Sequence, residues 1–169
     1  MEGRVELVGI ESVAAAAVEH VLDRAFGPDR HRRTAYRLRE GTRALPGLSL
    51  AAVADGALLG SIQCWPVRFV GDDGRDLPLV LVGPVAVAPE RQHEGLGRRL
   101  MSASLAAAGD AALMLIGDPD YYGRFFGFTA ARTAAWRLPG SVERHRLLAR
   151  GTGVPDGPGV IAPRVAVAA

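Results

Sequence analysis

The spacing of apolar residues predicts strands and helices in alternation along the N-terminal part of the chain. Apolar positions alternate between Arg4 and Ile10, as in a short strand. A helical stripe of apolar residues follows over 14–25, and we expect Ser12 to cap this helix. Gly27-Pro28 ends it, because proline cannot continue a helix. The pattern then predicts a second helix from Asp29 to Glu40.

The predicted second helix is dense in arginine. A solvated helix face accounts for such a run. A positively charged surface beside an anionic ligand is the alternative explanation of the arginines, and both interpretations stay open. The arginines are Arg30, Arg32, Arg33, Arg37 and Arg39.

The middle of the chain is predicted to form a run of strands. Two strand-like runs, 48–53 and 58–70, are joined by Asp55-Gly56, a dipeptide typical of tight hairpins. A turn over 71–74 leads into an almost continuously apolar run over 77–87. These segments indicate a largely antiparallel arrangement.

The most apolar of these strands contains Gly83-Pro84. Proline has no N–H to give to a sheet, so a central strand that holds it must bulge or splay at that point. This interruption is the first sign that the strand serves something other than packing.

The C-terminal half continues with shorter elements. A loop over 90–97 opens an apolar-striped helix, and an apolar strand follows over 111–116. A helical turn is expected over 120–125. From Pro139 onward the chain is rich in proline and glycine, and we expect this tail to be partly irregular.

Composition narrows the class of protein. The length of 169 residues favours one domain over residues 1–169. The formal net charge of +2 gives no reason to expect nucleic-acid binding. The single cysteine, Cys64, excludes an intrachain disulfide and is expected to be buried and inert. No apolar run approaches a membrane span, and the start of the chain (Met1 to Arg4) does not have the character of a signal peptide. A cytoplasmic protein that does not bind membranes is therefore expected.

The chemically informative segment is the loop before the helix, where Gln92, Gly95 and Gly97 form the pattern Q-x-x-G-x-G. Glycines let the backbone curl so that several N–H groups point into one concavity. The helix that follows adds unpaired N–H groups and the positive end of its dipole. Such a site binds phosphate or pyrophosphate without any lysine.

Two common nucleotide-binding motifs fit this loop poorly. A mononucleotide P-loop requires a Gly-Lys-Ser/Thr that does not follow. The dinucleotide fingerprint G-x-G-x-x-G is matched only by Gly95 and Gly97, with Leu100 in the third place. A glycine-bearing turn that merely caps a core helix stays open.

Residues 85–97 resemble the acetyl-CoA-binding motif of the GNAT superfamily of N-acetyltransferases: a strand, a proline, then Q/R-x-x-G-x-G/A opening a helix. The segment 120–128, with Tyr121 and Tyr122, resembles the tyrosine segment that precedes a closing Gly-Phe in the same superfamily. The order and spacing of the two motifs also agree.

The resemblance implies an α+β fold. Its sheet would be mixed, mostly antiparallel, six- or seven-stranded, splayed at a central bulged strand and flanked by about four helices. The opening of the sheet would fall at Gly83-Pro84.

The resemblance also implies acetyl-CoA as cosubstrate, with no metal. Backbone groups of the strand would pair with the pantetheine arm, and the loop would wrap the pyrophosphate, with the Glu94 side chain facing solvent. The cofactor-binding residues implied are Val85, Ala86, Val87, Gln92, His93, Glu94, Gly95, Leu96, Gly97 and Arg98.

The chemistry implied is direct attack of an amine on the thioester, with a tyrosine as proton donor to the leaving thiolate. Tyr122 is the first candidate and Tyr121 the second, and packing aromatics are the alternative. Tyr122 lies one residue further from Gly127 than is usual in the superfamily, so a bulge at Phe125 or Phe126 is expected to restore its place.

A general base is not assigned. Residues 77–88 contain no carboxylate, which leaves water, the substrate itself or Asp118, a residue equally suited to form a turn. His93 has no second ligand at metal-binding spacing. Trp65 and Trp136 fit either the core or a substrate pocket.

Two functions from different classes therefore compete. The first is an acetyl-CoA-dependent N-acetyltransferase acting on a primary amine, with a small molecule favoured over a protein tail. The second is a non-catalytic acyl-CoA-binding or regulatory protein of the same fold. A nicotinamide-nucleotide protein is a third hypothesis. Dimers are common in the superfamily, and the sequence leaves open whether this chain forms a homodimer.

Overall fold

The computed structural model describes residues 3–166 and contains a sheet of eight strands with four α-helices in that part of the chain. Met1 and Glu2, on which the expectation about a signal peptide partly rests, lie outside the described residues. The strands are β1 (Glu6–Gly9), β2 (Leu50–Ala54), β3 (Ala57–Gly71), β4 (Asp76–Val87), β5 (Leu113–Ile116), β6 (Trp136–Arg137), β7 (Leu147–Arg150) and β8 (Gly159–Pro163). The α-helices are α1 (Ala15–Phe26), α2 (Thr34–Arg37), α3 (Leu96–Ala108) and α4 (Pro119–Phe126). Short 3₁₀ turns are η1 (Ile10–Ser12), η2 (Pro28–Arg32), η3 (Pro89–Arg91) and η4 (Arg144–Arg146).

The sheet is mixed and mostly antiparallel, as predicted. Hydrogen-bonded neighbours follow the order β1-β2-β3-β4-β5-β7, and β8 pairs with both β3 and β6. Only the β4–β5 and β6–β8 pairings are described as parallel. The sheet has one strand more than the six or seven expected. The tail after Pro139 contributes β7 and β8 despite its prolines and glycines.

The chain divides into two compact units. The first takes in the chain up to His31 with residues 44–64 and 83–108, and the second holds 32–43, 65–82 and the chain from Gly109 onward. The long strands β3 and β4 run from one unit into the other. The prediction of a single domain stays a prediction.

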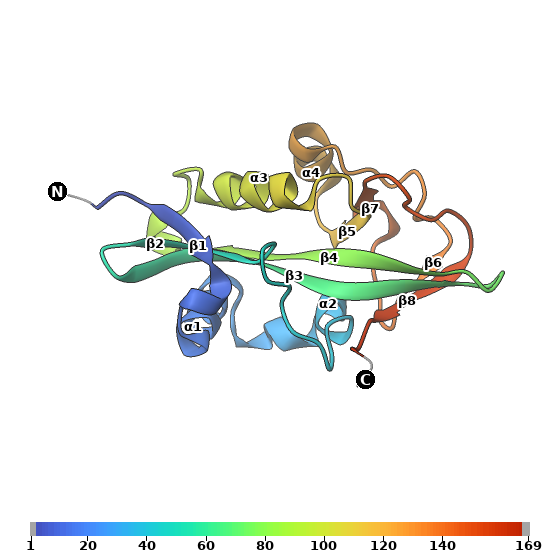
Figure 1. The fold of residues 1–169 in the computed structure, drawn as a ribbon, viewed down its shortest axis with the longest axis horizontal. Helices are drawn as coiled ribbons and strands as arrows, with labels where there is room; N and C mark the ends of the chain where they lie inside the picture. The colour runs from blue at the N-terminus through green and yellow to red at the C-terminus, as the bar shows by residue number, and fades with distance from the viewer. Residues whose placement is uncertain (1–2, 167–169) are drawn as a thin grey trace. The chain divides into compact units, whose positions relative to one another are not determined.

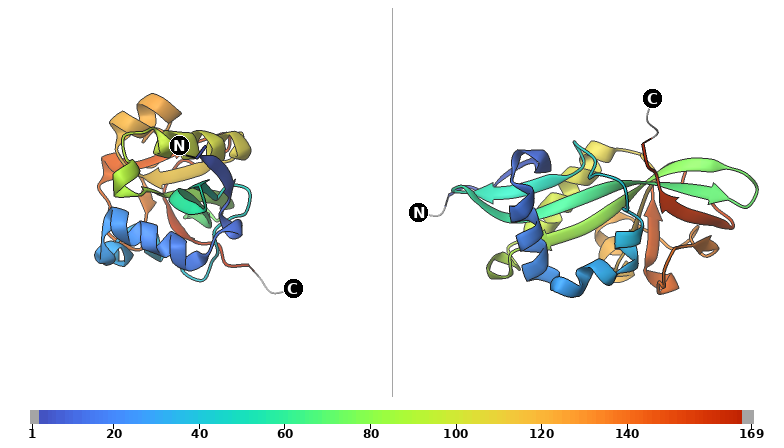
Figure 2. Two further views of the ribbon diagram at one scale, coloured as in Figure 1. Left: turned by 90° about the vertical axis from the view of Figure 1, so that its left-hand side faces the viewer. Right: turned by 90° about the horizontal axis from the view of Figure 1, so that it is seen from below.

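In the first unit, strands lie between two helices, with α1 on one side and α3 on the other (Figures 1 and 2). Val18, Val21 and Leu22 of α1 form a buried cluster with Ala86 of β4. The first residue of α3, Leu96, is buried in a second cluster with strand residues. Burial of these apolar stripes supplies most of the stability of such helices.

The predicted cap of the first helix is wrong. Ala14 precedes α1 and has no side chain that could cap it. Ser12 lies in η1, and its hydroxyl donates a hydrogen bond to the Gly9 carbonyl at 2.7 Å. The chain leaves β1 through this 3₁₀ turn, so the Ser12 hydroxyl stabilises the turn by pairing with a turn carbonyl. The helix begins three residues later, at Ala15. Gly27, with φ of 85°, ends the helix as predicted.

The predicted long helix over 29–40 is also wrong, because tertiary contacts break it. Arg30 is 2 % exposed and forms ion pairs with Glu19 and Asp23 of α1, so this arginine is not part of a solvated face. Only the one-turn helix α2 forms further on. There Thr34 and Arg37 donate side-chain hydrogen bonds to the carbonyls of Ser141 and Pro139.

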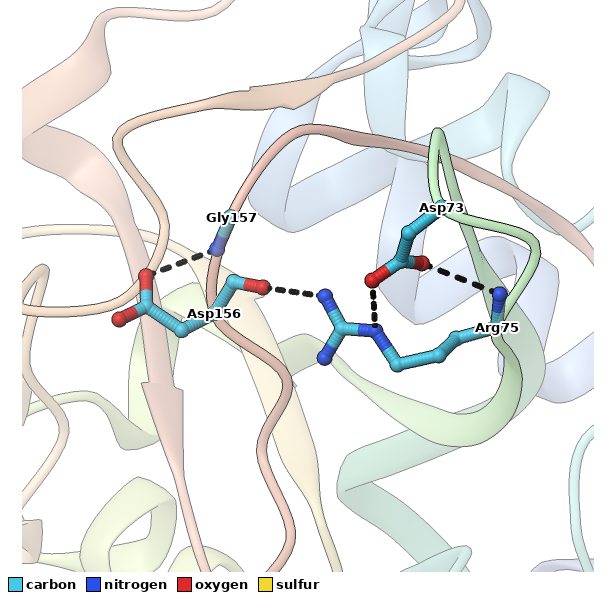
Figure 3. Close-up of polar contacts among 4 residues, drawn as sticks. All are labelled: Asp73, Arg75, Asp156 and Gly157. Atoms are coloured by element: carbon cyan, nitrogen blue, oxygen red, sulfur yellow. Dashed lines mark hydrogen bonds and ion pairs between the residues drawn. The ribbon is translucent and has the colours of Figure 1, made fainter.

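In the second unit, the hairpin between β3 and β4 is tied to the loop before β8. The Arg75 guanidinium donates to Asp73 Oδ2 at 2.7 Å and to the Asp156 carbonyl at 2.8 Å, and the Gly157 N–H donates to Asp156 Oδ1 (Figure 3). Beside this cluster Asp72 pairs with Arg137 at 2.6 Å. These contacts hold the tail beside β3, with which β8 pairs.

Candidate functional site

The candidate anion site lies in the first unit, where β4 passes through a loop into α3. The Ala88 N–H donates to the Leu59 carbonyl at 2.8 Å, which keeps the end of β4 on the sheet. η3 follows, and four residues, 92–95, lead to α3. Burial of Leu96 at 3 % exposure anchors the first turn of that helix. One end of the loop is therefore fixed by a hydrogen bond and the other by packing.

The loop turns through two left-handed residues. His93 has φ of 70° and Gly95 has φ of 82°. A non-glycine residue in this region is uncommon and strained, and such strain gathers at functional sites. Left-handed residues alternating with right-handed or extended ones bring successive N–H groups into one concavity. A Cβ at Gly95 would have no neighbour within 4 Å, so the space beside it is open.

The N-terminus of α3 adds further donors. The first-turn N–H groups of an α-helix have no carbonyl partner within the helix, and its dipole is positive there. The first turn of α3 carries no acidic residue that would occupy this position. A Cβ at Gly97 would lie 3.8 Å from Val87 and 3.9 Å from Val85, ordinary contact distances. Packing alone therefore does not require glycine here. Because Gly97 has no side chain, the backbone of α3 stays uncovered where it faces Val85 and Val87 of β4.

The acidic residues of the loop are neutralised. Glu94 accepts from Arg91 Nε at 2.8 Å, and its side chain is 45 % exposed, so it lies at the surface as expected. Glu90 forms a two-fold ion pair with Arg24 of α1. The hydrogen bond from Arg24 holds the pKa of Glu90 below its usual range. The exposed side chains of Arg98 and Arg99 lie in the first turns of α3, so the site carries positive charge.

The strand that leads to the loop, β4, is continuous over Asp76–Val87, and the bulge or splay predicted at Gly83-Pro84 stays a prediction. Gly83 has φ of 119°, a conformation that glycine adopts and other residues rarely do. In the second unit the described parallel register of β4 with β5 covers Val80 and Leu81. In the first unit β4 continues through Val85, half-buried, and Ala86, buried. The Gln92 side-chain amide reaches back and donates to the Val87 carbonyl at 3.4 Å.

The candidate tyrosines lie in the second unit, on α4. Asp118 caps this helix by accepting from the Asp120 N–H at 2.9 Å, which supports a structural role for that aspartate. Gly127, left-handed with φ of 75°, ends it. The helix is continuous over Pro119–Phe126, so the expected bulge at Phe125 or Phe126 does not form, and the additional phenylalanine lengthens the helix instead.

Tyr122 is the more enclosed of the two tyrosines. Its ring packs against Gly117, where a Cβ would lie 2.4 Å from Cε2, and it meets Phe128 edge-on at 6.5 Å. Tyr121 lies edge-on to Tyr122 at 4.9 Å. Burial raises the pKa of Tyr122, and the neighbouring Tyr121 and Asp118 raise it further against the opposing charge of Arg146. The Tyr122 hydroxyl is therefore fully protonated at neutral pH.

The remaining residues singled out in the sequence have structural surroundings. Cys64 is buried, and burial raises the pKa of its thiol. Trp65 and Trp136 are both buried, and Trp136 packs on Phe69 at 5.9 Å. No group of three or more His, Cys, Asp or Glu side chains within residues 3–166 is arranged to hold a metal ion. Among the helices of the same residues, none has both the length and the apolar character that crossing a bilayer requires.

Comparison with known proteins agrees with this arrangement. The model of the acetyltransferase (GNAT) family matches residues 14–128, which include α1, β4, the loop, α3 and both tyrosines. An Escherichia coli K12 protein described as the uncharacterized N-acetyltransferase YhbS is 32 % identical over 142 residues, 80 % of this chain and 83 % of its own.

Crystal structures show the same fold. The E. coli YhbS structure in complex with CoA has a TM-score of 0.71 and 26 % identity, and the match covers 96 % of this chain and 91 % of that one. A GNAT family acetyltransferase from Brucella melitensis in complex with acetyl-CoA has a TM-score of 0.64 and 28 % identity, covering 96 % and 97 %. The mixed, mostly antiparallel sheet that the chain shares with these structures thus defines an acyltransferase fold. The chain belongs to the GNAT family of acetyltransferases.

Proposed function

We propose that this protein transfers an acetyl group from acetyl-CoA to the primary amine of a small molecule. The observation that carries the proposal is the turn before α3, where His93 and Gly95 are left-handed and a helix N-terminus follows. A pyrophosphate carries the charge and the acceptor oxygens that such a cluster of N–H groups binds. The complexes of YhbS with CoA and of the Brucella protein with acetyl-CoA support the choice of ligand.

The residues present suit this ligand. The acidic side chains of the loop are paired with Arg91 and Arg24, so they do not oppose an anion. Gly97 leaves room beside Val85 and Val87. We propose that the backbone of Val85, Ala86 and Val87 pairs with the pantetheine amides, and that Gln92 through Arg98 wrap the pyrophosphate.

In the reaction proposed, the amine nitrogen forms a bond to the acyl carbon while the carbon–sulfur bond breaks. The nitrogen loses a proton to solvent, and the departing thiolate takes a proton from a tyrosine. Tyr122 is the proposed donor, because its hydroxyl remains protonated at neutral pH. Tyr121 is the second candidate.

Calorimetry with CoA tests the binding step. We expect Gly95→Ala to weaken CoA binding about tenfold or more, because alanine is strained at this φ and disturbs the turn. Gly27→Ala is the matched control, since Gly27 has φ of 85° and equally open surroundings at the end of α1. It should lose similar stability and keep its affinity. Equal affinity in both variants would contradict the proposed site.

Acetyl-CoA turnover with a panel of primary amines separates an enzyme from a non-catalytic acyl-CoA-binding protein. Release of free thiol that depends on the amine supports catalysis. Tight CoA binding with no amine-dependent release under any condition would support the binding protein instead.

A further inference from the structure

Two buried polar side chains, Ser61 and Gln63, interrupt the apolar middle of β3 in the first unit. Ser61 is 0 % exposed and Gln63 is 7 % exposed. Ser61 Oγ and Gln63 Oε1 are enclosed and have no hydrogen-bond partner among the described residues. Buried oxygens without a partner destabilise a fold, and native proteins contain few of them. Two on one strand therefore indicate a purpose other than packing.

The two side chains share the face of the sheet that is turned away from α3. Cys64, the next residue along β3, faces α3, since its sulfur lies 3.4 Å from Ser104 Oγ. Side chains alternate along a strand, so Ser61 and Gln63 point to the other face. On that face Ala86 of β4 packs against α1.

Gln63 lies beside the Gly83-Pro84 step of β4. A Cβ on Gly60 would lie 2.7 Å from the Ala86 carbonyl, and the N–H of Gly83 interacts with the Cys64 sulfur. The residue number rises along β3 from Gly60 to Cys64 while it falls along β4 from Ala86 to Gly83, so the two strands are antiparallel here. Gln63 therefore lies between the two contacts, next to Gly83-Pro84.

We infer that Ser61 and Gln63 bind the acceptor substrate as a neutral primary amine, an inference that rests on the function proposed above. A neutral amine has two N–H donors and one lone pair. Residues two apart on a strand have Cα atoms about 6–7 Å apart, so Ser61 and Gln63 are near enough along β3 to bind one substrate group together. With both hydrogens donated to Ser61 and Gln63, the lone pair stays free to attack the thioester.

The neutrality of the two side chains explains how the reaction proceeds without an assigned base. A carboxylate would stabilise the ammonium form, which has no lone pair. Neutral oxygens in a buried setting do the opposite, because burial lowers the pKa of an amine. The ammonium proton is therefore released to solvent when the substrate enters. This agrees with the absence of a carboxylate from residues 77–88.

The stability of the free protein gives the first test. Ser61→Ala and Gln63→Met remove an unpaired oxygen, so their urea unfolding midpoints should stay equal or rise. Ser104→Ala is the control, because the Ser104 hydroxyl donates to the Leu48 carbonyl at 2.7 Å and its removal should lower the midpoint. If the first two variants fall as far as the control, the oxygens are already satisfied and the inference is wrong.

Kinetics with n-butylamine give the second test. Gln63→Met should raise the KM for the amine about tenfold and leave the KM for acetyl-CoA unchanged. Gln63→Glu should move the acidic limb of the kcat profile to higher pH, because a carboxylate raises the pKa of the bound amine. A merely structural glutamine would not shift that limb. An unmoved limb together with an unchanged amine KM would overturn the inference.

CoA calorimetry on the wild-type protein distinguishes a failure of the proposed function from a failure of the role of Ser61 and Gln63. If CoA does not bind, the proposed function fails. If CoA binds while no primary amine is acetylated, the proposed function fails as well. If CoA binds and primary amines are acetylated while the Gln63 variants behave as wild type, only the role of Ser61 and Gln63 fails.

Discussion

His93 and Gly95 illustrate how single backbone conformations shape this protein. Gly95 adopts its left-handed φ without strain, whereas the Cβ of His93 meets its own backbone at φ of 70°. Such a residue persists only where its surroundings hold it. Here the buried Leu96 on one side and the end of β4 on the other fix the loop.

Replacing His93 by glycine should relieve this strain. We expect His93→Gly to raise the free energy of unfolding by roughly 0.5–1 kcal/mol, since the gain from removing the Cβ exceeds the entropy that glycine adds to the unfolded chain. Gln92→Gly is the control, because Gln92 has an ordinary φ of −69° and should lose stability. Urea denaturation of both variants measures the difference. A loss of stability in His93→Gly would show that the histidine side chain itself holds the loop.

Tyr122 gives a second prediction at this scale. Tyr122→Phe should lower kcat about 100-fold with little change in the KM for acetyl-CoA, because a proton donor acts only as the thiolate leaves. Tyr121→Phe should lower it far less, and steady-state kinetics of both variants test the order of the candidates. Reversed effects would assign the role to Tyr121.

Cys64 is predicted to be unreactive in the native state. Its thiol is buried and the raised pKa keeps it protonated, whereas the thiolate is the reactive form. A thiol reagent such as dithiobisnitrobenzoate should therefore modify no cysteine in the folded protein and one in guanidinium. Rapid modification of the native protein would mean that the strand opens readily at this position.

At the scale of elements, α1 and the turn after β4 are linked by the ion pair of Arg24 with Glu90. The pair is exposed, so salt screens it and its effect on global stability is small. Its position matters more than its strength, because η3 leads directly into the candidate anion site.

Arg24→Gln should therefore weaken CoA binding several-fold at low ionic strength, and less at high salt. Arg68→Gln is the matched control, since Arg68 forms a similarly exposed pair with Asp76 in the second unit. Calorimetry at two salt concentrations distinguishes them. Equal losses in both variants would point to general charge effects instead of positioning.

At the scale of the whole molecule, two paired carboxylates of the β3–β4 hairpin, Asp72 and Asp73, contribute to the acid sensitivity of the fold. The hydrogen bond from Arg137 lowers the pKa of Asp72, and that from the Arg75 N–H lowers the pKa of Asp73. A group whose pKa is lowered on folding adds stability above its unfolded pKa and loses it as the pH falls through the folded value.

The unfolding midpoint should accordingly hold steady from neutral pH down to about 4, the ordinary aspartate range, and fall below it. Asp72→Asn should flatten part of that decline. Thermal denaturation between pH 2 and 7 measures both curves. An identical acid decline in wild type and variant would show that other carboxylates dominate.

Local signals in the sequence were sufficient for the elements whose ends are set by backbone chemistry. Asp55-Gly56 forms the predicted hairpin with φ of 52° and 76°, because both residues tolerate the left-handed region that the turn needs. Gly27 ends α1 for the same reason. The turn before α3 was recognised from its glycines, and the family from that turn together with the tyrosine segment.

Long-range contacts decided the rest. Arg30 breaks the expected helix by pairing with α1, and the proline-rich tail becomes strands because β3 and β5 offer open edges to it. Ser61 and Gln63 look like ordinary polar residues of a strand until the folded chain buries them. Spacing along a chain records the conformation that each segment prefers, whereas burial and partner choice depend on residues far away in the sequence, which only the folded chain brings together.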